Sequence, residues 1–241
     1  MRCRLTDLPW GSGVTEKFAT QLSSGRPETQ RPRFITIEGP IGVGKTSLAK
    51  RLAATFGYQL LLENAEENPF LPRFYKNRRE AALSTQLFFL FQRIQQIQDM
   101  RQSDLFSPAH VSDFLLQKDR LFARINLDDD EMQLYDRVYE RVAVGAPVPD
   151  LVIYLQAPVH VLSQRVYRRG ISYEQSIDSE YLGALNQAYS QYFLYYDDAP
   201  LLIVNAEQID LVNNDRDYQQ FVDYLLTIKS GRHYFNPMSF A

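Results

Sequence analysis

The sequence predicts an α/β fold in which a five-stranded parallel sheet is flanked by helices. Short apolar runs alternate along the chain with segments whose apolar residues recur at helical spacing. A glycine-rich turn joins the first of these runs to the first helical segment. The chain has 241 residues, of which 45% are hydrophobic, and this is enough to bury strands between helices on both faces.

Five segments have the length and the apolar character of buried strands. The first, which begins at Arg33, alternates into a short β-run that ends at Glu38. The fourth, which follows Asp150, is a continuous apolar run, as expected for a strand covered on both faces. The strands are predicted at residues 33–38, 58–62, 110–114, 150–155 and 201–204.

Five segments between and after these strands have helical spacing. In the first, Leu48, Leu52 and Phe56 recur on one face. The helices are predicted at residues 45–56, 85–100, 159–169, 180–196 and 218–229. The acidic run Asp128 to Glu131 precedes a further helical run, and we interpret it as an N-terminal cap instead of a metal site.

The chain divides into an extension, one domain and a tail. Residues 1–32 have no sustained hydrophobic period, so we expect a poorly ordered N-terminal extension. Residues 33–229 contain no linker that would split them and are predicted to form one domain, followed by a C-terminal tail at 230–241. Arg2 and Arg4 raise a mitochondrial targeting hypothesis, but the acidic residues nearby make a cytoplasmic location the favoured one.

Charge and composition exclude several classes of partner. The chain has 26 Lys and Arg against 29 Asp and Glu, a net charge of −3, which argues against a DNA-binding or RNA-binding protein. No apolar run approaches the roughly 18 residues of a membrane span, so we expect no membrane partner. The single cysteine excludes an intrachain disulfide framework and favours a reducing compartment.

The strongest motif is a phosphate-binding loop. It follows the first strand and opens the first helix, as the pattern G-x-x-x-x-G-K-[ST] requires. Glycines let backbone amides approach phosphate oxygens, Lys45 reaches the terminal phosphates, and the Thr46 hydroxyl can bind Mg²⁺. The predicted ATP-binding residues are Gly39, Pro40, Ile41, Gly42, Val43, Gly44, Lys45, Thr46 and Ser47.

The remaining motifs narrow the class of nucleotide-binding protein. The Asn-Lys-x-Asp guanine motif of switch GTPases is absent from the sequence. Arg165, Arg168 and Arg169 end a predicted helix just before Gly170, where they can close over phosphates as a lid. A solvated basic helix end is the alternative for this cluster. With the phosphate-binding loop upstream, the cluster indicates a compact kinase of a small metabolite.

Such a kinase needs a group that deprotonates or orients its acceptor. Glu63 ends the second predicted strand, and the carboxyl ends of strands in an open α/β sheet line the ligand crevice. Glu66 and Glu67 follow, where acids at a helix start are ordinary. We therefore favour Glu63 as the general base.

From Arg33 to Lys229 the chain resembles deoxynucleoside kinases, the family of deoxyguanosine, deoxyadenosine and deoxycytidine kinases. The resemblance rests on ordered motifs at residues 34–46, 62–75, 154–158, 165–170 and 174–182. It implies that Glu63 is the base for the 5′-hydroxyl and that Tyr75 and Glu174 hold the 3′-hydroxyl. It also implies that Gln86 binds the edge of the base, with Arg93 and Asp119 lining the base pocket. Phe70, Phe89, Phe91 and Phe114 are candidates to stack on that base.

The chain departs from the family pattern at two places. Its third strand ends Ser112-Asp113-Phe114. Relatives have an arginine directly after this acid, and that arginine steadies the glutamate that acts as general base. Asp113 matches the family's acid and is kept as a substrate-site candidate. Ile171 stands where many relatives have a third lid arginine, and Arg168 is the candidate to replace it.

The resemblance implies ATP-dependent phosphorylation of the 5′-hydroxyl of a deoxynucleoside, with Mg²⁺ as cofactor. Arg93 and Asp119 favour purine deoxynucleosides or deoxycytidine over thymidine, because in relatives this pair crowds the thymine methyl group. Of these acceptors we favour the purines. Relatives are commonly homodimers, and Leu87, Phe91 and Ile94 on the long helix suit either a dimer contact or the core. Two alternatives stay open: a nucleoside-monophosphate kinase such as thymidylate kinase, and a nucleotide-binding regulatory module without catalysis.

Overall fold

The computed structural model describes residues 31–103 and 109–236 of the chain. The predicted N-terminal extension, residues 1–32, lies outside the described residues except for its last two. Within the described ranges no helix has both the length and the apolar character needed to cross a membrane.

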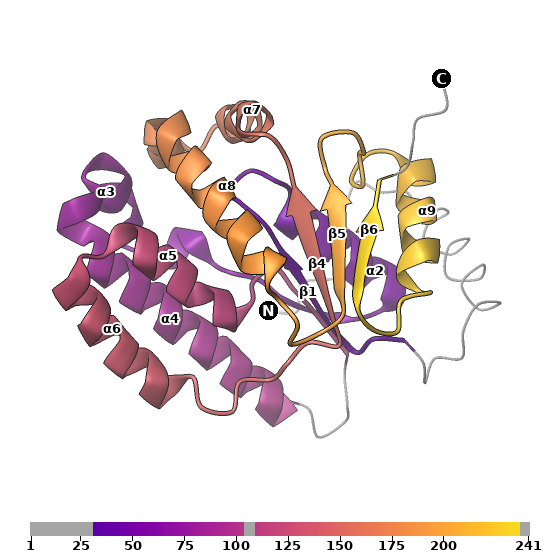
Figure 1. The fold of residues 1–241 in the computed structure, drawn as a ribbon, viewed down its shortest axis with the longest axis horizontal. Helices are drawn as coiled ribbons and strands as arrows, with labels where there is room; N and C mark the ends of the chain where they lie inside the picture. The colour runs from indigo at the N-terminus through magenta and orange to yellow at the C-terminus, as the bar shows by residue number, and fades with distance from the viewer. Residues whose placement is uncertain (1–30, 104–108, 237–241) are drawn as a thin grey trace, which may run out of the picture.

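One parallel sheet forms the centre of the molecule (Figure 1). Its strand order is β2-β3-β1-β4-β5-β6, so β1 lies between β3 and β4. The strands are β1 (Phe34–Glu38), β2 (Gln59–Leu61), β3 (His110–Ser112), β4 (Leu151–Gln156), β5 (Leu201–Asn205) and β6 (Arg232–Phe235). The predicted fold class is confirmed, and the carboxyl ends of all six strands meet at one edge.

The prediction of five strands was wrong, because the sheet has six. The sixth strand, β6, comes from the segment that was expected to be a tail, and it pairs in parallel with β5. Its four residues are only partly buried or exposed, as at a sheet edge, so they carry no apolar run that would predict a strand. Arg232 fastens this strand by donating to the carbonyls of Leu194 and Tyr196 at 2.9 and 3.3 Å.

The helices cover the sheet and extend beyond it. They are α2 (Lys45–Phe56), α3 (Leu71–Lys76), α4 (Arg78–Ser103), α5 (Asp119–Asn126), α6 (Asp129–Val142), α7 (Val159–Arg169), α8 (Ser179–Leu194) and α9 (Asp215–Leu225). The predicted bounds of α2 and α7 match, whereas α4 begins seven residues before the predicted Thr85 (85 − 78 = 7). Asp128 and Glu131 form a reciprocal capping box at the start of α6, which confirms the capping interpretation.

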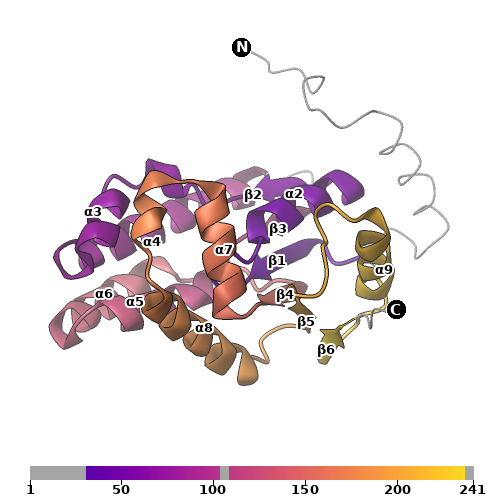
Figure 2. The same ribbon diagram turned by 90° about the horizontal axis from the view of Figure 1, so that it is seen from above.

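The two faces of the sheet bury different cores. Apolar residues of α2 and α9, among them Leu52 and Phe221, pack against one face. Residues of α4, α5 and α8, among them Leu90 and Tyr189, pack against the other. In Figure 2 α2 and α8 lie on opposite sides of the strands. Helices on both faces are what this parallel sheet requires, since its central strands β1, β4 and β5 are buried on both faces.

Three short 3₁₀ turns connect these elements near the carboxyl edge of the sheet. They are η2 (Ala65–Glu67), η4 (Leu116–Lys118) and η5 (Ser172–Ser176). The strand order changes direction at β1, because its neighbours β3 and β4 are reached by crossovers on opposite sides. In open α/β sheets a crevice forms outside the strand ends at such a point, and ligands bind there.

Candidate active site

The phosphate-binding loop connects β1 to α2 and places Gly39 to Ser47 at the switch point of the sheet. A Cβ atom at Gly39 would lie 2.5 Å from the carbonyl oxygen of Leu155, and one at Gly42 would lie 2.9 Å from that of Leu162. Both glycines have positive φ angles, +149° and +84°, so their identity is required by conformation and by space. The Lys45 ammonium donates to the carbonyls of Gly39 and Pro40 at 2.8 and 3.3 Å.

Asp113 joins the loop to the end of the second strand. Its Oδ2 accepts a hydrogen bond from the Thr46 hydroxyl at 2.5 Å, and its Oδ1 accepts one from the Glu63 amide at 2.8 Å. Burial raises the pKa of the Asp113 carboxyl, and these two bonds oppose the rise in part. The residue at the end of the third strand therefore sets the backbone position of the candidate base.

Glu63 and Asp119 share one cation. The guanidinium of Arg93, whose side chain is 4% exposed, is ion-paired with both carboxylates. Burial alone would raise the pKa of Glu63. The positive charges of Arg93, Lys118 and Lys45 outweigh burial and hold that pKa below its ordinary value. Glu63 is thus kept ionised, as a general base must be.

Asp119 is fully buried at the start of α5. Its second oxygen accepts a hydrogen bond from the hydroxyl of Tyr135 on α6 at 2.6 Å, and Tyr135 is itself completely buried. Burial raises the pKa of the Tyr135 hydroxyl, so this group donates at any physiological pH. The acid that lines the predicted base pocket is therefore fixed from two sides.

The residues that are predicted to bind the acceptor nucleoside lie around Arg93 and Asp119. Gln86 is 3% exposed and lies two helical turns before Arg93, so both side chains project from one face of α4. Within the described part of the chain no hydrogen bond occupies the Gln86 amide, which leaves a donor and an acceptor for a ligand. The ring centres of Phe89 and Phe114 lie 5.2 and 5.9 Å from the guanidinium carbon of Arg93. Phe91, another candidate for base stacking, is 51% exposed.

Tyr75 and Glu174 close the other end of this region. The Tyr75 ring stacks on that of Tyr173, with 6.0 Å between centroids and an interplanar angle of 7°. Burial, the neighbouring Tyr181 and the negative charge of Glu174 raise the pKa of the Tyr75 hydroxyl. Glu174 is 8% exposed within η5. A hydroxyl and a carboxylate from separate elements here can bind a sugar hydroxyl together.

The arginines at the end of α7 lie over the phosphate-binding loop and the acceptor residues. Arg165 donates to the carbonyls of Val43 and Ala206 at 3.2 and 2.7 Å. Arg169 is ion-paired with Glu174 at 2.6 Å, so it connects the lid to the predicted sugar site. Arg168 is exposed, and its side chain forms no hydrogen bond or ion pair with another described residue. The structure therefore brings two of the three predicted lid residues into the network.

Sequence reasoning missed four participants: Glu38, Lys118, Tyr135 and Tyr173. Lys118 is 3% exposed in its side chain and pairs with the buried Glu38 at 3.3 Å. The sequence feature that could have indicated Lys118 is the missing arginine after Asp113. Without that arginine, the end of the third strand brings no cation to the predicted site. Glu38 interrupts the apolar pattern at the end of β1 and was a second signal.

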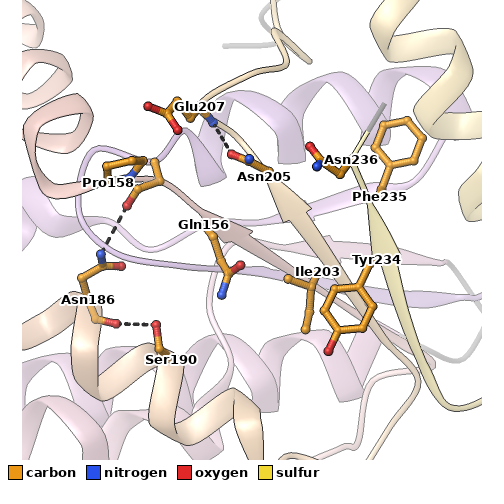
Figure 3. A pocket seen from close by; sticks show the side chains of 11 residues that line it. Gln156, Pro158, Asn186, Ser190, Ile203, Asn205, Glu207, Tyr234, Phe235 and Asn236 are labelled. Atoms are coloured by element: carbon orange, nitrogen blue, oxygen red, sulfur yellow. Dashed lines mark hydrogen bonds between the residues drawn. The ribbon is translucent and has the colours of Figure 1, made fainter. Parts of the chain in front are cut away.

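A pocket of about 430 Å³ opens at the carboxyl ends of β4, β5 and β6 (Figure 3). Gln156, Asn186, Asn205 and Tyr234 are among its lining residues, and none of the predicted site residues lines it. Asn205 and Glu207 of this pocket flank Ala206, whose carbonyl anchors Arg165. The pocket therefore adjoins the lid and is separate from the acceptor residues.

Comparison with known proteins gives the family. The sequence model of the deoxynucleoside kinases matches residues 35–228. A deoxyguanosine kinase of Bacillus subtilis (strain 168) is 32% identical over 199 residues, which cover 80% of this chain and 95% of that protein. A deoxyadenosine kinase of Lactobacillus acidophilus is 30% identical over 196 residues, covering 76% and 89% of the two chains.

Solved structures agree with the sequence comparison. The structure of a deoxyadenosine kinase from M. mycoides with bound dATP superimposes with a TM-score of 0.69 at 26% identity, and covers 80% of this chain and 98% of that one. The same enzyme with bound dCTP gives a TM-score of 0.69 over 81% of this chain. The matched region includes the phosphate-binding loop, Glu63, Arg93 and the lid, and so the chain belongs to the deoxynucleoside kinase family.

Proposed function

We propose that the protein transfers the γ-phosphoryl group of ATP to the 5′-hydroxyl of a purine deoxynucleoside. One observation carries this proposal: the ionised Glu63 lies within the fields of Lys45 of the phosphate-binding loop and of Arg93 beside the predicted base pocket. A base between a triphosphate cradle and a nucleoside pocket is the arrangement that phosphoryl transfer to a hydroxyl needs. Family membership supports the same reaction.

In the proposed reaction the 5′-oxygen attacks the γ-phosphorus. The O5′–P bond forms while the bond from phosphorus to the β,γ-bridging oxygen breaks, and ADP leaves with that oxygen. The proton of the 5′-hydroxyl passes to the Glu63 carboxylate, which later releases it to solvent. Lys45, the loop amides, Arg165 and Arg169 stabilise the negative charge on the transferring group.

The residues present fit a magnesium ion. The Thr46 hydroxyl and the Asp113 carboxylate lie in contact at the mouth of the loop, and Mg²⁺ prefers such oxygen ligands. Within the described ranges no group of three or more acidic, histidine or cysteine side chains could hold a metal, in keeping with an ion that binds mainly through phosphates and water. When bound, Mg²⁺ would neutralise charge on the β- and γ-phosphates.

The choice of a purine acceptor rests on the pocket and on the relatives. Gln86 and Arg93 offer donors and an acceptor to a base edge, and Asp119 orients Arg93. The relatives named above are a deoxyguanosine kinase and a deoxyadenosine kinase. We propose that Tyr75 and Glu174 bind the 3′-hydroxyl, because their side chains lie at the far end of the same region.

A kinase screen tests the proposal. Purified protein with ATP and Mg²⁺ is offered the four deoxynucleosides and their monophosphates, and product is measured by coupled ADP release. We expect deoxyguanosine or deoxyadenosine to give the highest kcat/KM, and Glu63→Gln to remove turnover while ATP-analogue binding survives. Turnover of monophosphates alone would establish a monophosphate kinase. Nucleotide binding without any product would establish a regulatory module.

We propose that the protein is a cytoplasmic homodimer. Phe91 on α4 and Leu134 on α6 are 51% and 50% exposed, and these two helices pack together through their buried faces. Exposed apolar residues on adjacent helices favour association between copies. Light scattering after size exclusion measures the mass, and Phe91→Glu is expected to give the monomer. The single Cys3 fits a reducing compartment.

A further inference from the structure

Lys118 is a buried lysine that the reaction outlined above does not use. It ends the η4 turn, which leads from β3 to α5, and it is 2% exposed. Lysine is almost never fully buried unless it is paired, because its charge loses hydration. The protein therefore keeps a costly charge at the carboxyl edge of the sheet.

The anchor of Lys118 is Glu38, the last residue of β1. Glu38 Oε1 lies 3.3 Å from the Lys118 ammonium and also accepts the Leu115 amide at 2.7 Å. Its Oε2 accepts the Gly39 amide at 3.1 Å and the Tyr189 hydroxyl at 3.0 Å. Through this carboxylate, Lys118 is tied to the first amide of the phosphate-binding loop.

The surroundings of Lys118 are otherwise aromatic. Its ammonium lies 4.7 Å from the centre of the Phe122 ring and 5.6 Å from that of Tyr189. Among the described residues, Glu38 is the one acidic side chain in ion-pair contact with this ammonium. An ammonium has three N–H donors, so the contacts leave donor capacity for a ligand.

Charged groups from four elements act on Lys118. Glu38 at the end of β1 and Glu63 after β2 favour its charged form, whereas Arg93 on α4 and Lys45 on α2 oppose it. Burial is the largest influence and lowers the pKa of Lys118. Lys118 thus belongs to the electrostatic environment of Glu63 and Lys45, the two residues on either side of the proposed transfer.

The end of the third strand has no cation directly after Asp113, and Lys118 follows a few residues later. Phe114 follows Asp113 directly, and the side chain that follows the acid is therefore apolar. Phe114 is 2% exposed and packs with the α4 core, so it brings no charge to the site. Lys118 lies four residues after Phe114, and the η4 turn places its ammonium at the same edge of the sheet.

We propose that Lys118 is a positioning residue of the phosphoryl-transfer site. Held by Glu38, its ammonium fixes the start of the phosphate-binding loop, and its positive charge acts on Glu63 as negative charge develops on the transferring group. This replaces the cation that the third strand lacks. The inference rests on the proposed function, because it concerns the rate of that reaction.

The primary test replaces Lys118 by a side chain of similar shape without charge. In the full-length chain, Lys118→Met is expected to lower kcat about 100-fold, while KM for ATP and for the deoxynucleoside changes less than about threefold. Lys118→Arg restores charge and is expected to recover at least about tenfold of the loss. Lys50→Met, at an exposed lysine of α2, is the matched control and should behave as wild type.

A double variant separates catalysis from folding. Lys118→Met leaves Glu38 buried without its cation, which destabilises the fold, and adding Glu38→Gln removes that unpaired charge. We expect the pair Glu38→Gln with Lys118→Met to recover Tm but not kcat. Recovery of kcat together with Tm overturns the proposal, as does wild-type kcat in Lys118→Met. A wild-type protein that phosphorylates no deoxynucleoside refutes the proposed function first and this inference with it.

Discussion

Arg93 is ion-paired with both Glu63 and Asp119, so one guanidinium joins the candidate base of the reaction to the wall of the predicted base pocket. A lysine does not reproduce this contact, because two different nitrogens of the guanidinium bind the two carboxylates, whereas an ammonium has a single nitrogen. The proposed recognition of the acceptor and the ionisation of Glu63 therefore involve the same side chain.

Removing this guanidinium should move the pH dependence of turnover. Among the charges that hold the pKa of Glu63 low, that of Arg93 has the largest effect, so in Arg93→Met this pKa rises. The base is then protonated at higher pH, and the acidic limb of kcat/KM shifts upward. A pH–rate profile measures the limb, with Arg79→Met, at an exposed arginine of the same helix, as the control. An unmoved limb would show that Arg93 does not govern Glu63.

Tyr135 is expected to affect the binding of the deoxynucleoside without contacting it. Tyr135→Phe removes only the hydroxyl that donates to Asp119 at 2.6 Å, and leaves a buried carboxylate oxygen without that donor. We expect a loss of about 1–3 kcal/mol in the free energy of unfolding and a higher KM for the deoxynucleoside, with KM for ATP unchanged. Urea unfolding and steady-state kinetics measure the two effects. Tyr139→Phe is the control, since its hydroxyl makes only a 3.4 Å contact; equal KM effects in both variants would contradict the assignment.

Glu63 should make stability depend on pH in a defined direction. Its pKa in the fold lies below the ordinary 4.5, so ionised Glu63 contributes stability above its unfolded-state pKa, and this is lost as pH falls through the folded-state pKa. The difference in unfolding free energy between wild type and Glu63→Gln is therefore largest near neutral pH and shrinks below about pH 4. Urea titrations at several pH values measure this difference. A difference that grows on acidification would mean that the pKa of Glu63 is raised.

The parts of the molecule that the sequence predicted well are those whose signal is local. The loop from Gly39 to Thr46 needs glycines at fixed positions, because backbone carbonyls of Leu155 and Leu162 approach too closely for a Cβ atom. The bounds of α2 and α7 follow from apolar spacing and from Gly57 and Gly170, each in the left-handed conformation that ends a helix. The glycine motif and the apolar spacing that signal these elements each lie within a few residues, although the carbonyls that crowd the loop come from distant residues.

The parts that were missed depend on distant partners. Lys118 and Glu38 are 80 residues apart (118 − 38 = 80), and no local pattern shows that the turn after β3 brings them together. Tyr173 owes its role to stacking on Tyr75, across two elements. The sixth strand was missed because an edge strand needs only backbone pairing with β5, which its partly exposed residues do not reveal.

The sixth strand should contribute to the stability of the whole sheet. Arg232→Met removes the two bonds to the carbonyls of Leu194 and Tyr196, which connect β6 to the end of α8. We expect a loss of about 1–3 kcal/mol, since hydrogen bonds from a charged group are the stronger kind. Urea unfolding measures it, and Arg216→Met, at an exposed arginine of α9, is the control. If Arg232→Met and Arg216→Met unfold alike, β6 is not fastened through this guanidinium.

Two glycine-to-alanine variants should have opposite effects. Gly183 lies within α8, and a Cβ atom there meets no atom within 4 Å, so alanine is expected to add about 0.5–1 kcal/mol by helix propensity. Gly42 has φ +84°, and its Cβ atom would lie 2.9 Å from the Leu162 carbonyl and from the Val166 side chain. Gly42→Ala should therefore displace α7 from the loop, which lowers Tm and weakens ATP-analogue binding.

A third variant separates backbone strain from lost space at the loop. Gly44 has φ +107°, but a Cβ atom there has no neighbour within 4 Å, so Gly44→Ala carries the strain without the clash. We expect its loss of Tm and of nucleotide affinity to lie between those of Gly183→Ala and Gly42→Ala. Thermal unfolding and a binding titration with a non-hydrolysable ATP analogue rank the three variants. Equal nucleotide affinity in Gly42→Ala and Gly44→Ala would show that the contact of the loop with α7 does not shape the phosphate site.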